Sequence, residues 1–290
     1  MGGKKSWGSP RLEPRKQDER EKLNNNQKMT SKQHIRDLAL IGAGYWGKNL
    51  ARNFNELGVL HTICDRSEEL LNNFKTEAYS ETNLTSSIET VFADSTITKV
   101  AIAVPAAYHY EVALAALNAG KDVFVEKPLC LNREELDAIK KDYQAVKNPF
   151  LMLGFNRRFA PLTQTLKKLL KSKSDPKSFI YTVNAGFIPP EHWTQHPEIG
   201  GGRLLGEGCH FIDLIRFLAA SPIENATVQY AQSPGVKSMD TFSIQLSFTD
   251  GSLGTVHYFA NGSKSFPKER LDVFCAGSIL QLDNFRTLQA

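Results

Sequence analysis

Cysteine is scarce in this chain, and its cysteines form no recognisable motif. The 290 residues include four cysteines, which are far apart and have no CxxC spacing. Neither a zinc ribbon nor a disulfide-rich secreted domain is therefore indicated. Long apolar runs are also missing, because none approaches the roughly 20 residues that cross a membrane, and the first residues lack the apolar stretch of a signal peptide. These absences predict a soluble, cytoplasmic protein with no membrane partner.

A basic surplus is missing from most of the chain. The formal net charge is +4, while residues 1–35 hold nine Lys or Arg and four Asp or Glu, which leaves about −1 on residues 36–290. A domain that binds nucleic acid concentrates basic charge on its folded surface, so no nucleic-acid partner is expected. Residues 1–35 are also poor in large apolar side chains, which predicts a disordered basic tail.

Short apolar segments alternate with helical segments from residue 36 to about residue 150. The expected strands are 38–41, 60–64, 99–104, 122–125 and 150–153, and the expected helices are 48–57, 68–77, 87–92, 108–118 and 132–146. This alternation is typical of βαβ units in a parallel sheet. We therefore predict an α/β protein whose first domain, residues 36–149, is a Rossmann-type doubly wound parallel sheet.

The pattern changes near residue 150. An expected strand at 179–185 and a long helix at 203–219 precede expected strands at 226–231, 241–248, 253–259 and 271–274. Asp250-Gly251 between two of these strands is a hairpin signal. Residues 150–290 are therefore predicted to form an α+β domain with a largely antiparallel open sheet.

A glycine-rich turn follows the first expected strand. Gly42-Ala43-Gly44-Tyr45-Trp46-Gly47 has the spacing of a dinucleotide-binding fingerprint. In that pattern the first glycine permits a tight turn, the second lets the backbone approach a pyrophosphate, and the third lets the helix pack on the strand. Asp65 ends the second expected strand, where a carboxylate accepts hydrogen bonds from the adenosine ribose. The pattern predicts NAD as the cofactor, while Arg66 beside Asp65 leaves NADP open because it could receive a 2′-phosphate.

Two further residues are suited to moving a proton. Lys127 follows the expected strand at 122–125, at the carboxyl end where ligands of open α/β sheets bind, and a lysine whose pKa is lowered by burial can transfer a proton. His210 lies on the expected helix 203–219, and histidine titrates near neutrality. A solvated lysine and a structural histidine are the ordinary alternatives for these two positions.

His192 and His196 have the i, i+4 spacing of helical zinc ligands. Three prolines close to them argue against a regular helix, and no HExxH motif is present. No metal site is therefore expected.

Several segments together resemble the Gfo/Idh/MocA oxidoreductase family. They are the glycine turn, Val104-Pro105 with His109, residues 119–129 with Glu126-Lys127-Pro128, and Gly200-Gly201-Gly202 followed by residues 208–213. The resemblance spans about residues 36–285, and the local sequence is most similar to members associated with surface-polysaccharide and nucleotide-sugar metabolism. It implies a Rossmann domain that binds NAD(P), an open C-terminal sheet for substrate binding and oligomerisation, and hydride transfer between nicotinamide and a sugar or cyclitol carbon.

The resemblance also assigns residues to roles. Lys127 and His210 match the catalytic lysine and histidine, and Pro105 is expected beside the nicotinamide. The expected cofactor-binding residues are Gly42, Gly44, Tyr45, Trp46, Gly47, Asp65, Arg66, Val104, Pro105, His109 and Glu126. The expected substrate-binding residues are Lys127, Asn156, Arg157, Glu207 and His210.

Two departures from the family pattern affect these expectations. Many members have an aspartate four residues before the histidine, where this chain has Gly206 with Glu207 one position along. One residue turns a side chain by about 100° around a helix, so Glu207 is not an automatic replacement. The chain also ends at Ala290, where relatives continue with further helices, which implies a truncated member.

The resulting prediction is an NAD(P)-dependent dehydrogenase that interconverts a hydroxyl and a ketone on a sugar, nucleotide sugar or cyclitol. It is expected to be a homo-oligomer that associates through the C-terminal sheet. Two alternatives stay open: an NAD-dependent glycosidase of the same family, and a catalytically weak scaffold or sensor that binds the dinucleotide.

Overall fold

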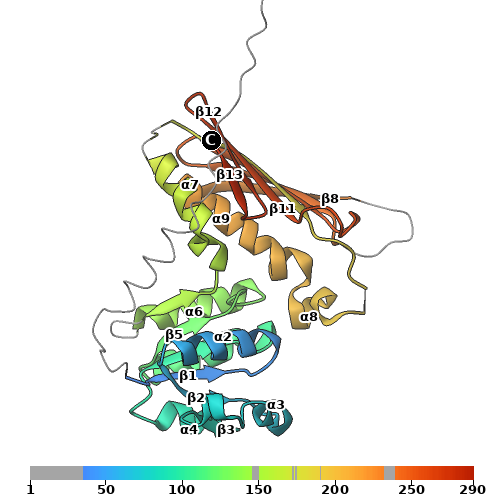
Figure 1. The fold of residues 1–290 in the computed structure, drawn as a ribbon. Helices are drawn as coiled ribbons and strands as arrows, with labels where there is room; N and C mark the ends of the chain where they lie inside the picture. The colour runs from blue at the N-terminus through green and yellow to red at the C-terminus, as the bar shows by residue number, and fades with distance from the viewer. Residues whose placement is uncertain (1–34, 146–149, 172, 174, 190, 232–238) are drawn as a thin grey trace, which may run out of the picture. The chain divides into compact units, whose positions relative to one another are not determined.

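The computed structural model describes residues 35–145, 150–171, 173, 175–189, 191–231 and 239–290. Arg36–Ala290 form one compact unit that contains two β-sheets (Figure 1). The expected basic tail lies outside the described residues, apart from Ile35 at its end.

The first sheet has six strands, all parallel, in the order β3-β2-β1-β4-β5-β6. Its strands are β1 Leu38–Ile41, β2 Leu60–Cys64, β3 Asn83–Thr85, β4 Lys99–Ile102, β5 Asp122–Val125 and β6 Leu151–Leu153. The chain begins in the centre of the sheet and winds first to one edge and then to the other. The carboxyl ends of β1 and β4 therefore meet at the switch point where doubly wound sheets bind their ligands.

Helices cover both faces of this sheet. Helices α2 (Tyr45–Glu56) and α3 (Glu68–Asn72) pack on the face of Leu38 and Leu40. Helices α4 (Ile88–Ala93), α5 (His109–Asn118) and α6 (Arg133–Ala145) pack on the face of Ala39 and Ile41. Because both faces are covered, all four residues of β1 are buried, which explains the continuous apolar run in the sequence. The predicted Rossmann-type sheet is confirmed.

The second sheet has seven strands in the order β13-β12-β11-β7-β10-β9-β8. These strands are β7 Ser178–Asn184, β8 Ile223–Tyr230, β9 Phe242–Phe248, β10 Leu253–Phe259, β11 Glu269–Cys275, β12 Ser278–Asp283 and β13 Thr287–Gln289. All neighbours are antiparallel except β7 and β10, which run parallel. The prediction of a largely antiparallel second sheet is therefore confirmed.

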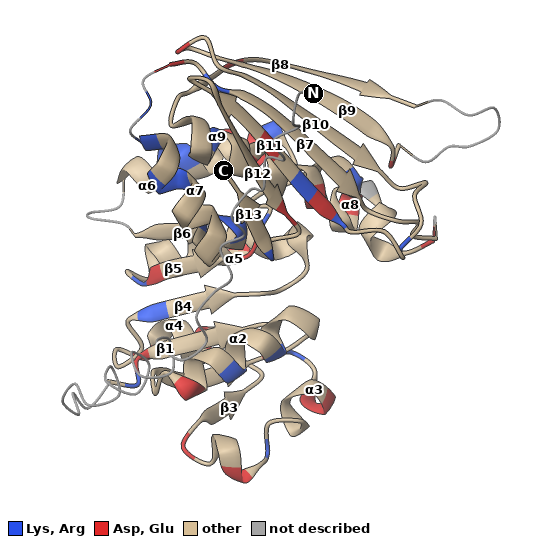
Figure 2. Cartoon of the chain, turned by 45° about the horizontal axis from the view of Figure 1, so that its top comes forward, with Lys and Arg blue, Asp and Glu red and all other residues tan. Residues whose placement is uncertain are grey.

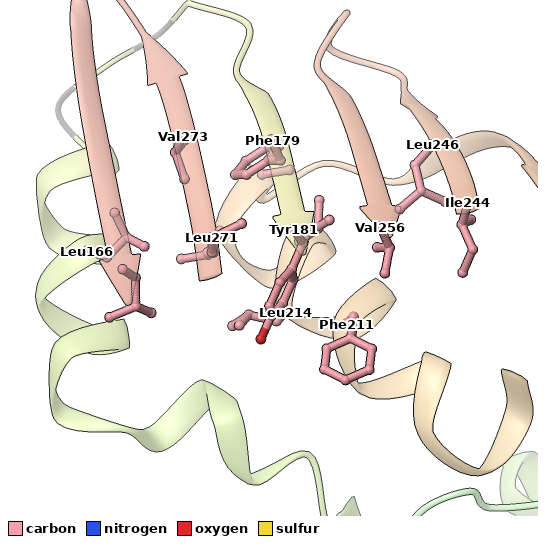
Figure 3. Close-up of a cluster of buried hydrophobic side chains, with 14 of the residues drawn as sticks. Leu166, Phe179, Tyr181, Phe211, Leu214, Ile244, Leu246, Val256, Leu271 and Val273 are labelled. Carbon is pink, nitrogen blue, oxygen red and sulfur yellow. The ribbon is translucent and has the colours of Figure 1, made fainter. Parts of the chain in front are cut away.

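Two helices, α7 (Pro161–Lys171) and α9 (Cys209–Ala219), cover one face of the second sheet. Figure 3 shows Leu166 of α7 and Leu214 of α9 directed at the inward side chains of the strands, such as Tyr181 and Leu271. Buried and more exposed residues alternate along β7, β9 and β10, as expected of a sheet with one covered face.

The opposite face of the second sheet carries exposed apolar side chains, among them Ile180, Leu253 and Ile279. Strands β9 and β10 contain no charged residue and are tan throughout in Figure 2. In the described part of the chain, no helix combines the length and the apolar character needed to cross a membrane.

The expected helix at 203–219 forms, but a π-helical turn, η5 (Leu204–Gly208), comes directly before α9. A π-turn takes up one residue more than an α-turn and often occurs at functional sites. Helix α7 and strands β3, β12 and β13 were not predicted, and β8 begins at Ile223, earlier than the expected residue 226. The remaining short helices are η1 (Glu77–Tyr79), η2 (Ala106–Tyr108), η3 (Asn156–Phe159), η4 (Trp193–Gln195) and α8 (Pro197–Gly200).

Candidate active site

In the glycine turn after β1, two of the glycines leave no room for a side chain, and a third faces open space. A Cβ on Gly42, whose φ is +100°, would lie 2.6 Å from the carbonyl of Ala103, and a Cβ on Gly47 would lie 1.9 Å from the carbonyl oxygen of Gly42. A Cβ on Gly44 would meet nothing within 4 Å. Gly44 therefore leaves open space in front of the N-terminus of α2, where free N–H groups favour an anion.

Asp65 fixes this turn to the end of β2. Its Oδ2 accepts a hydrogen bond from the N–H of Ala43 at 2.7 Å, and its Oδ1 accepts one from the N–H of Ser67 at 2.8 Å. Each carboxylate oxygen has a second lone pair, so Asp65 can still accept from a ribose hydroxyl. Arg66 is exposed, with its guanidinium carbon 5.4 Å from the ring centroid of Tyr108, and Tyr45 is also exposed.

A cleft of about 620 Å³ lies at the carboxyl ends of β4 and β5. One wall comes from the first sheet and the other from η3, η5, the start of α9 and the start of β11. The sequence-predicted residues that line it are Trp46, Val104, Pro105, His109, Glu126, Lys127, Asn156, Arg157, Glu207 and His210. Gly42, Gly44, Tyr45, Gly47, Asp65 and Arg66 do not line it.

Lys127 reaches across this cleft. Its Nζ donates a hydrogen bond of 2.7 Å to the carbonyl oxygen of Gly206, a residue 79 positions further along the chain. No carboxylate of the described residues forms an ion pair with it. An ammonium group has three N–H donors, so two remain for a molecule bound in the cleft.

His210 is buried at the first turn of α9, with 8% of its surface exposed. Its Nδ1 is buried and has no hydrogen-bond partner among the residues that the structure describes. Burial lowers the pKa of His210, and the charges of Arg157, Lys127 and Lys268 lower it further, to about 2. The imidazole is therefore neutral at physiological pH, and its surroundings resist its protonation.

His109 ties the ends of β4 and β5 together. Its ring nitrogens lie 2.6 Å from the carbonyl oxygen of Pro128 and 2.8 Å from that of Val104. Burial lowers the pKa of His109 and the two carbonyls offset this in part, so the neutral ring donates to one of them. Glu126 also faces the cleft, and burial raises the pKa of its carboxyl group.

Arg157 lines the cleft but is already paired. Its guanidinium donates two hydrogen bonds to Glu269, at 2.6 and 2.9 Å, and lies over the ring of Phe211. Glu269 also accepts a hydrogen bond of 2.6 Å from the hydroxyl of Tyr181. Asn156 lines the same wall.

Glu207 does not orient His210 through a hydrogen bond. Its Oε2 accepts from the hydroxyl of Tyr258 at 2.9 Å, and its Oε1 lies 3.1 Å from Nη1 of Arg203. Nor does the backbone leave room for the family aspartate, because a Cβ on Gly206 would lie 2.8 Å from the carbonyl oxygen of Gly200.

Some lining residues were not identified from the sequence. Arg203 directly follows the Gly200-Gly201-Gly202 segment, so its place beside that motif was a usable signal. Lys268 and Glu269 reach the cleft because β11 pairs with β7, a long-range pairing that no local motif encodes. Within the described ranges, no group of three His, Cys, Asp or Glu is placed to hold a metal ion.

The comparisons with known proteins agree with this architecture. Residues 36–155 match the family described as GFO/IDH/MocA oxidoreductases with an NAD-binding Rossmann fold, and residues 163–279 match the GFO/IDH/MocA C-terminal domain. The chain belongs to the Gfo/Idh/MocA oxidoreductase family. The glycine turn fits the dinucleotide that this family binds, because Gly44 leaves the phosphate approach open and Asp65 ends β2 beside it.

Two relatives in this family act on inositols according to their names. The scyllo-inositol 2-dehydrogenase (NADP(+)) IolW of Bacillus subtilis is 27% identical over 79% of this chain and 62% of the relative. The myo-inositol 2-dehydrogenase of Thermotoga maritima is 25% identical over 86% of this chain and 75% of the relative. A crystal structure of a probable dehydrogenase from Thermotoga maritima has the same fold, with a TM-score of 0.75 at 24% identity over 85% of this chain and 75% of that one.

Proposed function

We propose that this protein is an NAD(P)-dependent dehydrogenase that interconverts a hydroxyl and a ketone on a sugar, nucleotide sugar or cyclitol. One observation carries the proposal: Lys127 from the first sheet and His210 from α9 line the same cleft, at the carboxyl end of β4. That end is the switch point of the doubly wound sheet, beside the glycine turn.

Each residue has a defined part in the proposed reaction. NAD, when bound, supplies the acceptor for the hydride. Lys127 orients the reacting oxygen through its remaining N–H donors. When the ketone is reduced, its ammonium group donates a proton to that oxygen, and when the hydroxyl is oxidised, the amine takes the proton back. His210 is neutral in the free protein and can accept a hydrogen bond from the substrate, although its surroundings resist its protonation, while the contacts of His109 with the carbonyls of Val104 and Pro128 keep this wall in place.

A substrate panel with one variant tests the proposal. Sugars, nucleotide sugars and cyclitols are offered with NAD or NADP, and the absorbance of the reduced nicotinamide is followed. Lys127→Ala should lower turnover by roughly 10²- to 10⁴-fold, the usual range for a positioned acid or base, and leave cofactor affinity nearly unchanged. Lys75→Ala is the matched control, because Lys75 is exposed and does not line the cleft.

The same panel separates the alternatives. Net reduction of the cofactor by a sugar supports a dehydrogenase. Sugar turnover without net reduction points to the glycosidase alternative, and tight cofactor binding with no turnover points to a scaffold or sensor. An unchanged rate in Lys127→Ala would remove the lysine from the mechanism.

We further propose that copies of the chain associate through the open face of the second sheet. Support comes from the exposed apolar side chains of Ile180, Leu253 and Ile279 on this face and from the lack of charge on β9 and β10. Light scattering after size exclusion tests this proposal, and Ile279→Asp should shift the mass towards the monomer. A monomeric wild-type protein contradicts it.

A further inference from the structure

Charged residues are unevenly distributed around the cleft. Its lining includes four cations, Lys127, Arg157, Arg203 and Lys268, and three acids, Glu126, Glu207 and Glu269. All of the cations except Lys127 come from the part of the chain that builds the second sheet. Whether a bound molecule meets net positive charge therefore depends on whether the three acids are already paired with protein groups.

The carboxylate of Glu269 is already paired with other protein groups. It is buried, and its carboxylate accepts two hydrogen bonds from Arg157 and one from Tyr181. Burial raises the pKa of Glu269, but Arg157 and Tyr181 lower it, and the net pKa lies below its ordinary value. Arg157 and Glu269 thus form a closed ion pair.

Glu207 is occupied in a similar way by Tyr258 and Arg203. Glu126 lies on the wall of the first sheet, where burial raises the pKa of its carboxyl group. Lys127 and Lys268 are left without an ion-pair partner among the described residues. Lys268 is exposed at the mouth of the cleft, so it can meet a ligand without rearrangement.

Arg203 has an unused donor. Its side chain is only 2% exposed, and its Nε is buried without a hydrogen bond from the residues that the structure describes, while its Nη1 lies 3.1 Å from Oε1 of Glu207. Buried donors without an acceptor are rare, because leaving one unpaired costs free energy. Arg203 thus adds positive charge to the wall of the cleft, although Nε itself has no accessible surface.

The strand register places these cations around the same part of the cleft. Val183 on β7 pairs with Tyr258 on one side and with Glu269 on the other. Tyr258, whose ring lies 5.2 Å from the guanidinium carbon of Arg203, and Glu269, the neighbour of Lys268, are therefore on the two strands that flank β7. The cleft of about 620 Å³ that both cations line has room for a sugar-sized molecule.

We propose that the substrate of this cleft is an acid, whose carboxylate or phosphate group binds in the part lined by Arg203 and Lys268. The inference rests on the proposed function in taking this cleft as the substrate site. The diphosphate of the cofactor belongs at the glycine turn, and Gly42, Gly44 and Gly47 do not line the cleft with Arg203 and Lys268, although Trp46 of the first turn of α2 does.

The position of His210 agrees with this proposal. Burial is the largest cause of the lowered pKa of His210, and Arg157, Lys127 and Lys268 also oppose a positive charge on it. An anion bound among these cations offsets their share of the effect, and a neutral substrate does not.

Matched pairs of ligands test the inference by calorimetry on the NADH-loaded protein. The probes are glucose against glucuronate, glucose against glucose 6-phosphate, and UDP-glucose as a source of diphosphate. We expect at least one anionic probe to bind about tenfold or more tightly than glucose, and this preference to weaken with added salt. Tight binding of glucuronate alone, glucose 6-phosphate alone or UDP-glucose alone identifies a carboxylate, a phosphate monoester or a diphosphate as the recognised group.

Lys268→Met should reduce the preference for the anionic probe over glucose by about tenfold. Lys264→Met should leave this preference unchanged, because Lys264 is a nearby exposed lysine that does not line the cleft. Equal binding of glucose, failure of every anionic probe at millimolar concentration, or an unchanged preference in Lys268→Met overturns the inference. Failure of the proposed function looks different: anionic probes bind in a Lys268-dependent manner, yet no sugar reduces the cofactor.

Discussion

Placing the family aspartate at Gly206 should damage the protein rather than improve it. The Cβ of any substituted residue would lie 2.8 Å from the carbonyl oxygen of Gly200, a backbone atom that cannot rotate away. Overpacking of this kind costs about 1–3 kcal/mol. For a protein of this size, that cost corresponds to a fall in melting temperature of roughly 2–6 °C.

The same substitution should also disturb Lys127, because its Nζ donates to the carbonyl oxygen of Gly206. Relief of the clash moves this carbonyl and with it the anchor of the ammonium group. Gly206→Asp and Gly206→Ala should therefore both lose turnover with the best substrate of the panel, even though aspartate is the residue that many relatives have.

Thermal unfolding followed by circular dichroism, together with turnover, measures both effects. Leu205→Ala is the control, since Leu205 is 42% exposed and a surface substitution changes stability by about 0.5 kcal/mol or less. If Gly206→Asp melts with the wild type and turns over faster, the backbone at Gly200 does not exclude a side chain and our reasoning fails.

Two further predictions concern Asp65 and Glu269. Asp65→Asn should narrow the preference for NAD over NADP, because the side chain no longer repels a 2′-phosphate. Titration of both cofactors measures the ratio of the two affinities. Tighter binding of NADP than of NAD by the wild type would mean that Arg66 dominates. Burial raises the pKa of Glu269, but Arg157 and Tyr181 lower it below the ordinary value of 4.5. The hydrogen bonds of this carboxylate therefore stabilise the folded protein above about pH 4.5, and this contribution is lost as the pH falls through the lowered pKa. Tyr181→Phe should cost about 1–3 kcal/mol in urea unfolding at pH 7, and the difference from the wild type should shrink towards pH 3 or so; an equal difference at both pH values contradicts the linkage.

The first sheet could be predicted almost completely because its information is local. Strands such as Leu38–Ile41 are short apolar runs, and the spacing of Gly42 and Gly47 indicates a tight turn between strand and helix. The boundary near residue 150 and the roles of the individual site residues stay predictions. Helix α7 was missed although Pro161 at its first position and Leu162, Leu166 and Leu170 give a helical spacing.

The rest of the site depends on pairings between distant segments. Glu269 faces Arg157 only because β11 pairs with β7, and Glu207 turns to Tyr258 because η5 takes up an extra residue before α9. The turn of about 100° per residue separates Glu207 from the position of Gly206 on a helix, but it does not indicate which partner Glu207 finds.

The parallel pairing of β7 and β10 has a consequence for how this protein diversifies. Two parallel strands cannot be joined by a hairpin, and here the chain between them includes β8 and β9. Arg203, Glu207 and His210 lie between β7 and β8, on a segment whose described residues form no strand. Mutations can accumulate on this segment without a change of strand register, so this part of the cleft wall can evolve while the sheet beneath it is inherited unchanged.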